Sequence, residues 1–323
     1  MPQLHPRLRW ALPRLVGLAI LAWVLHRVGP GAFLDTFREV GPLWFFVLLG
    51  LNVPHLWCKI ERWHRMLLDQ GIDLGRRRSA TAYLAGIALG AFTPGRAGEF
   101  FRAWFPVRQV GAPLAASLAT VLADRLYDLA FLMSVSALAA FWLTGAHWAL
   151  AGTGALAAVL GALFLLRHPL RRTLSRLRLR LGLSDDQKAL FVGTLSSCVR
   201  RWPAPLAWTV AGHLFMNLQV WVLAHAVGAG LTFFESFLLF SVANTVALLP
   251  VSILGLGTRE AVLGALFVIA GQSEIHGVTV ALGFFLLGSV PVTLAGGLLL
   301  LFPPGAKDGK SASDADPSLH SRP

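Results

Sequence analysis

Thr93 to Arg102 reads TPGRAGEFFR, and it follows the apolar run AYLAGIALGAF directly. The stretch places a proline, two glycines, two arginines and a glutamate in an otherwise apolar region. At the centre of a bilayer, each charge that faced lipid would cost roughly 2.5 to 3.5 kcal/mol. Irregular backbone at membrane depth is tolerated only where it is buried in protein or lines a wet cavity. We therefore expect these charges to face inward.

Composition indicates that the surroundings are a membrane. Of 323 residues, 55% are hydrophobic and only 14% are charged, and the mean hydropathy is +0.64. Soluble domains carry about 25% charged residues. Apolar windows recur along almost the whole chain, and about 20 such residues cross the hydrocarbon core as a helix. The prediction is an all-α, polytopic integral membrane protein built as a helical bundle.

The distribution of charge predicts the orientation and excludes nucleic acid as a partner. The net charge is +12, but the basic residues lie in short loops between apolar segments, where the positive-inside bias accounts for them. The basic stretches 59–78 and 167–201 and both termini are expected on the cytoplasmic side. This predicts a multi-pass protein of the cytoplasmic (inner) membrane. The two cysteines indicate neither a disulfide framework nor a zinc site, and we expect no metal and no cofactor.

One of the apolar windows between the two basic stretches must not cross the membrane. Three windows lie there, and three crossings would put the basic stretches on opposite sides. The window 79–93 reaches only about 22 Å as a helix, short of a core about 30 Å thick. Pro94 disfavours helix in the residue before it, and Gly95 permits a reversal. Residues 79 to about 108 are predicted to form a re-entrant hairpin that opens to the cytoplasm.

A second break has the same composition. The window SFLLFSVANTVALLP, 236–250, also ends at a proline and is followed by VSILGLGTRE. Short, Gly/Pro-interrupted segments in corresponding positions of two halves are typical of inverted-repeat transporters. The candidate turn residues of the two breaks are Pro94, Gly95, Gly98, Pro250, Gly255 and Gly257.

The predicted organisation is one membrane domain, 1–302, followed by a tail. Its first half covers about 1–166, a cytoplasmic amphipathic linker covers 167–201, and its second half covers 202–302. The tail 303–323 is polar and rich in small residues, which predicts disorder.

Charges after the first break have two interpretations. Asp124 and Asp128 are four residues apart and share a helix face, and Arg125 can brace Asp128. They form either a structural ion pair near the interface or pairs with Arg96 or Arg102. We favour the second, because charges inside spans usually pair and mark pathways. His213 is expected to hydrogen-bond between helices. A proton relay through it is the alternative, for which no acidic neighbour is expected.

The motifs PGRAGEFFR, DRLYD and LPVSILGLGTRE resemble the flippase-like transmembrane region of lysylphosphatidylglycerol synthases, from about Leu12 to Leu301. ERWHRML, at 61–67, is similar to an arginine-tryptophan element of that family. The acid before Arg125 is usually Glu in the family, and Leu254 stands where a glycine is usual. No stretch resembles the aminoacyl-transfer domain of the synthases, so the resemblance implies lipid translocation alone. The motif residues that it implies as functional are Pro94, Arg96, Gly98, Glu99, Arg102, Asp124, Arg125, Asp128, Gly255, Gly257, Arg259 and Glu260.

The favoured function is that of a lipid flippase or transporter for an anionic or lipid-linked headgroup, rather than an enzyme. No HExxH, acidic metal cluster or GxSxG motif is present, so we assign no catalytic residue. An intramembrane enzyme that acts on a lipid-linked substrate and a non-transporting accessory protein are the alternatives. The expected partner is membrane lipid, and a homodimer is left open. The candidate substrate-binding residues are Arg96, Glu99, Arg102, Asp124, Arg125, Asp128, Arg259 and Glu260.

Overall fold

The computed structural model describes residues 40–144, 184–248 and 255–301, together with a few isolated positions before residue 40. The predicted N-terminal membrane segment, the first half of the linker (167–183), Pro250 and the tail 303–323 lie outside the described residues. The described ranges contain helices and turns but no strand.

Four helical stretches in these ranges are long and apolar enough to cross a membrane, which makes this an all-α polytopic membrane protein. One of them consists of three consecutive elements, because a π-helical turn interrupts it. The four are α3 (Pro42–Asp69), α6 (Leu114–Thr144), α10 (Pro203–Ala226), and the run of α13 (Glu274–Phe284), η2 (Phe285–Ser289) and α14 (Val290–Leu301).

The first predicted break forms a helical hairpin. α4 (Arg76–Ala91) ends just before Thr93, whose backbone is extended, and the 3-10 helix η1 (Pro94–Ala103) then runs back along α4. The Thr93 hydroxyl accepts a hydrogen bond from the Gly98 amide at 2.7 Å. A side chain at Gly98 would overlap the Leu89 carbonyl, so only glycine allows the two arms to approach this closely.

The first hairpin begins and ends at the same end of the molecule. After η1, the short α5 (Trp104–Val110) leads to α6, and the turn before α4 packs against the start of α6 in one apolar cluster. α9 (Asp185–Arg200) lies at this end too, since Arg201 pairs with Asp69 at 2.9 Å. The ends of the two basic stretches therefore lie together, as the charge pattern predicts.

The second hairpin opens at the opposite end. It consists of α11 (Phe233–Val246) and α12 (Thr258–Ile269), and the Gly230 amide before it donates to the Gln272 side chain after it at 3.1 Å. This end also holds the beginning of α3, because the rings of Trp44 and His225 lie 6.2 Å apart. A helix of 28 residues, as α3 is, measures about 42 Å. The two hairpins thus enter from opposite ends of one molecule.

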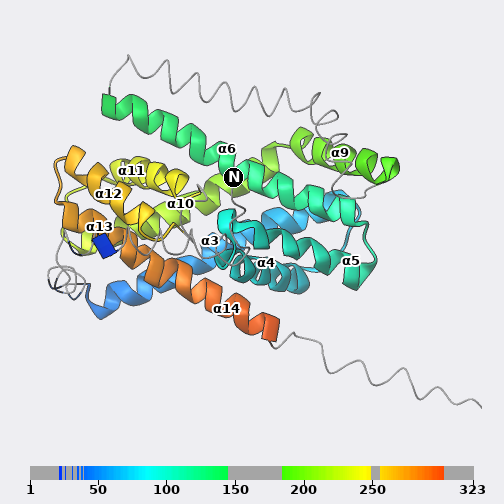
Figure 1. The fold of residues 1–323 in the computed structure, drawn as a ribbon, viewed down its shortest axis with the longest axis horizontal. Coiled ribbons are helices and arrows are strands. Elements are labelled where there is room, and N and C mark those ends of the chain that lie inside the picture. The colour runs from blue at the N-terminus through cyan, green and yellow to red at the C-terminus, as the bar shows by residue number, and fades with distance from the viewer. Residues whose placement is uncertain are drawn as a thin grey trace, which may run out of the picture.

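The two halves pack reciprocally. Each described half contains a long helix, a hairpin and a second long stretch, in that order. α3 packs on α10, while α4 packs on α14 from the other half and α11 packs on α6 (Figure 1). Exchange of corresponding contacts in this way is what an inverted repeat produces, and it agrees with the predicted arrangement.

One predicted boundary is wrong. The sequence pattern places a loop from Lys59 onward, but α3 continues without interruption to Asp69. Arg62 and Trp63, in that extension, are almost completely buried. The reason is that acidic residues of α6 neutralise the charges, so the helix needs no contact with water at this point.

Candidate functional site

Asp124 is the centre of a buried charge network between α3, η1 and α6. Its Oδ1 accepts from Nε of Arg62 at 2.7 Å and lies 2.6 Å from Nη2 of the same arginine. Its Oδ2 is paired with Nη2 of Arg102. The predicted pairing of the α6 acids with the first hairpin is confirmed.

Arg102 is held on both faces as well as at its tip. Its guanidinium lies 4.3 Å from the ring centre of Tyr83 and 4.9 Å from that of Trp63. Its exposed fraction is 1%. Cation–π contacts of this kind are strongest where water is excluded. The arginine therefore ties η1 to α3, α4 and α6 at once.

Asp128 is paired with cations from α3 and from its own helix, α6. Its carboxylate lies 2.9 Å from Nζ of Lys59, 2.9 Å from Nη1 of Arg62 and 3.7 Å from Nη2 of Arg125. The brace expected from Arg125 is confirmed. His213 on α10 places Nε2 at 3.4 Å from the same carboxylate. The expectation that His213 has no acidic neighbour is therefore wrong, because packing of α10 against α6 supplies one.

Glu99 links this network to the tip of the first hairpin. Its Oε2 lies 2.7 Å from Nη1 of Arg125, and its Oε1 lies 3.2 Å from Nε of Arg96. Glu99 is buried, whereas the Arg96 side chain is 39% exposed. Arg96 also has a φ of 58°, and it is the one described residue other than glycine in the left-handed region. Non-glycine residues there are uncommon, and such strain concentrates at functional sites.

The second hairpin presents its own arginine beside a tight turn. Gly255 and Gly257 have φ values of 74° and 84°, so both predicted turn glycines occupy the left-handed region. Glu260 accepts from the Gly257 amide and caps α12 with its side chain. Arg259 is buried, contacts Asn244 at 3.5 Å and lies over the ring of Phe284. The predicted Arg-Glu pair thus divides its tasks, with Glu260 shaping the turn and Arg259 facing the protein interior.

The tip of the first hairpin lies near the beginning of α12. Arg96 is close enough to Arg259 for the two positive charges to repel each other. In the described residues, the network around Asp124 has more cations than anions: five basic side chains are joined by ion pairs to three carboxylates. The basic members are Lys59, Arg62, Arg96, Arg102 and Arg125, and the acidic members are Glu99, Asp124 and Asp128.

Three members of the site were not predicted as site residues. Lys59 and Arg62 were assigned to a loop, and Tyr83 to an apolar window, although its hydroxyl donates to Asp124 at 3.4 Å. The spacing of Lys59 and Arg62 could have indicated two of them. These residues are three positions apart, so they share one face of a helix that continues directly from an apolar run. Within the described residues, no group of three or more His, Cys, Asp or Glu side chains is placed to hold a metal ion.

Comparison with known proteins agrees with this architecture. The family described as "Lysylphosphatidylglycerol synthase TM region" matches residues 10–296. A "UPF0104 membrane protein" of Methanothermobacter thermautotrophicus is 29% identical over 116 residues, which is 35% of this chain. The match spans 34% of that relative, about a third of its length. No solved structure matches the chain.

Proposed function

Because the chain belongs to the lysylphosphatidylglycerol synthase TM region family, we propose that it moves an anionic lipid headgroup across the cytoplasmic membrane. The basic end of the molecule, with the ends of α3 and α9, faces the cytoplasm in this proposal. Each hairpin enters the bilayer from one side and returns to that side. The observation that carries the proposal is the excess of positive charge in the network, which reaches Arg96 at the tip of the first hairpin and lies near Arg259.

The excess of cations favours an anionic substrate. Unneutralised charge inside a membrane is costly and marks a pathway or a binding site. A phosphodiester that approached the hairpin tips would offset the repulsion between Arg96 and Arg259. Arginine suits this task, because its planar fork donates two parallel hydrogen bonds to a phosphate. The headgroup would travel between the tips while its acyl chains stay in lipid.

The network divides into substrate-facing and supporting parts. Arg96 is the exposed member, so we assign it and Arg259 to phosphate contact. Glu99 holds Arg96 in place, and Arg125 keeps Glu99 neutralised when Arg96 turns toward the phosphate. Arg102 and Asp124 are completely enclosed, and we assign them to holding the hairpin.

A lipid-translocation assay tests the proposal. The full chain is reconstituted in liposomes that contain fluorescent phosphatidylglycerol, and the fraction of probe accessible to a membrane-impermeant quencher is followed. We expect the wild type to accelerate exchange between leaflets and Arg259→Ala and Glu99→Gln to reduce the rate at least tenfold. Arg78→Ala, which removes an exposed arginine at the beginning of α4, is the matched control and should keep the rate.

Three results would contradict translocation. The first is a wild-type rate no faster than that of empty liposomes. A second is a change in the chemical identity of the lipid without movement, which an intramembrane enzyme would produce. The third is unchanged exchange in Arg259→Ala and Glu99→Gln with a lower folded yield, which would make these charges purely structural, as in an accessory protein.

A further inference from the structure

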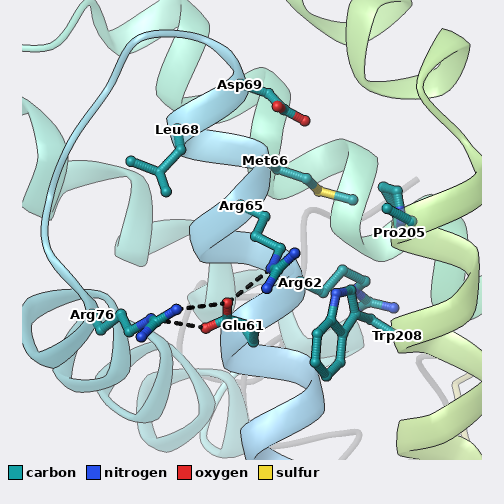
Figure 2. Close-up of a pocket in the computed structure, with 10 residues that line it drawn as sticks. Glu61, Arg62, Arg65, Met66, Leu68, Asp69, Arg76, Pro205 and Trp208 are labelled. Atoms are coloured by element: carbon teal, nitrogen blue, oxygen red, sulfur yellow. Dashed lines mark hydrogen bonds and ion pairs between the residues drawn. The ribbon is translucent and has the colours of Figure 1, made fainter.

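A cavity of about 310 Å³ lies outside the charge network, at the basic end of the molecule. It is lined by the last turns of α3, the beginning of α4 and the beginning of α10 and is open on one side (Figure 2). Arg62 forms part of its wall, and the same side chain bonds Asp124 and Asp128 in the network. The cavity is therefore one side chain away from the site described above.

Two arginines converge at this cavity on one buried carboxylate. Oε1 of Glu61 accepts from Nε of Arg65 at 2.8 Å and from Nη2 of Arg76 at 3.4 Å (Figure 2). The Glu61 side chain is only 5% exposed, whereas those of Arg65 and Arg76 are 52% and 65% exposed. One carboxylate thus serves two cations, each of which keeps donors available at the surface. Asp69, also at the cavity, is paired with Arg201 at 2.9 Å.

This geometry suits a phosphate group. Because both guanidinium groups bond to the same oxygen of Glu61, their nitrogens are held within the distance that two oxygens of one phosphate can bridge. Trp208 lies 5.2 Å from the Arg65 guanidinium and restricts its movement. Exposed ion pairs are usually worth only about 0 to 1 kcal/mol and need no buried partner. A buried glutamate that orients two exposed arginines indicates a prepared anion site.

The surroundings favour a lipid as the source of the phosphate. Trp208 and the start of α10 contribute an apolar wall beside the arginines, and Leu68 is exposed at the rim. Tryptophan is enriched where membrane meets water, at the level of lipid headgroups. Basic clusters at the cytoplasmic surface attract anionic lipids.

We propose that this cavity binds the phosphate group of an anionic phospholipid through Arg65 and Arg76, as a surface subsite from which the headgroup passes toward the network. The inference rests on the proposed function, because translocation is the reason for a headgroup to move from here to Arg96. Inorganic phosphate shares the recognised chemistry, and the test separates it from lipid.

Calorimetric titration of the detergent-solubilised full chain tests the subsite. The probes are short-chain phosphatidylglycerol, inorganic phosphate and dioctanoylglycerol, which lacks phosphate. We expect phosphatidylglycerol to bind and dioctanoylglycerol not to bind. The double variant Arg65→Gln/Arg76→Gln should weaken phosphatidylglycerol binding at least tenfold. Arg77→Gln/Arg78→Gln removes equal charge from exposed positions beside the cavity and should leave binding unchanged.

The other outcomes also have fixed meanings. Equal binding of inorganic phosphate would support the phosphate site and remove its preference for lipid. Equal weakening by both double variants, or binding of dioctanoylglycerol as tight as that of phosphatidylglycerol, would overturn the proposal. Should the first variant fold poorly, Arg65→Lys/Arg76→Lys keeps the charge, removes the fork and should still weaken binding.

The translocation assay separates this inference from the proposed function. Arg65→Gln/Arg76→Gln should raise the lipid concentration at half-maximal rate and leave the maximal rate unchanged. Arg259→Ala should lower the maximal rate, which the double variant leaves unchanged. A wild type that binds phosphatidylglycerol through Arg65 and Arg76 but moves no lipid would reject translocation and keep the subsite.

Discussion

Arg96 combines a strained backbone with a charge at the tip of the first hairpin. Its left-handed conformation costs an ordinary residue of order 1 kcal/mol, whereas glycine adopts it freely. If the position served the turn alone, a glycine would form it without this strain. The arginine side chain is therefore retained at a cost in stability, which fits its assignment to phosphate contact.

The variant Arg96→Gly separates the two roles of this residue. Relief of the backbone strain should keep the thermal unfolding temperature at or above that of wild type, while loss of the cation should reduce lipid translocation at least tenfold. The measurement is a thermal unfolding curve in detergent together with the liposome assay. A variant that is destabilised but transports at the wild-type rate would contradict the assignment.

Among the site residues, we expect Asp124 to contribute most to the stability of the fold. Asp124→Asn leaves Arg62 and Arg102 buried with too little negative charge, and breaking a buried pair in this way costs about 3 to 5 kcal/mol. We expect a large fall in the midpoint of thermal unfolding. Asp186→Asn, at an exposed position on α9, is the control and should change it little. Equal midpoints for the two variants would show that the network does not stabilise the fold.

The residue scale also shows how far the sequence could predict the site. The motif positions and the pairing of Asp124 with the first hairpin could be predicted, because charge in an apolar segment needs a partner nearby. The partner of Arg62 could not, since Asp124 lies 62 positions away and only packing of α3 on α6 joins the two. The neighbour of His213 was missed for the same reason.

At the scale of elements, the first hairpin depends on close contact between its arms. Gly98→Ala would place a methyl group against the Leu89 carbonyl, and overpacking of this kind costs about 1 to 3 kcal/mol. We expect a lower folded yield and a lower unfolding midpoint. Gly50→Ala has open space around it and serves as the control. Wild-type stability in Gly98→Ala would mean that the arms are further apart than described.

Packing of α9 against α3 and α6 can be followed through a thiol. Burial raises the pKa of Cys198 to about 12, and Asp69 adds to the effect. A raised thiol pKa means that the reactive thiolate stays scarce at lower pH. Between pH 7 and 9, Cys198 should therefore react with maleimide far more slowly than an exposed thiol, because its thiolate fraction stays far smaller at every pH in this range. Leu190→Cys, at an exposed position of the same helix, should react much faster throughout. Equal rates would contradict the packing.

A helix break could be predicted from the sequence where local residues cause it. A helix end could not be predicted where contacts with other helices determine it. Pro94 and the glycines around it interrupt the chain in any surroundings, and the hairpin follows. The extension of α3 to Asp69 depends instead on acids supplied by α6.

For the whole molecule, the central feature is a pair of hairpins that open at opposite ends, with Arg96 of the first within electrostatic reach of Arg259 of the second. The parity of apolar windows predicted a first hairpin that returns to its starting side, and the contact between Asp69 and Arg201 agrees with it. The reciprocal packing of α4 on α14 and α11 on α6 could not be predicted, because apolar helix faces do not specify their partners.

Labelling of single cysteines by a membrane-impermeant maleimide in intact and opened vesicles tests this architecture most directly. Arg77→Cys and Gln109→Cys flank the first hairpin, and Gly230→Cys and Ser273→Cys flank the second. The native cysteines Cys58 and Cys198 are buried and give a low background. We predict that the first two positions label from one side of the membrane and the last two from the other. Labelling of Arg77→Cys and Gln109→Cys from opposite sides would mean that residues 77–109 cross the bilayer, and would contradict the account.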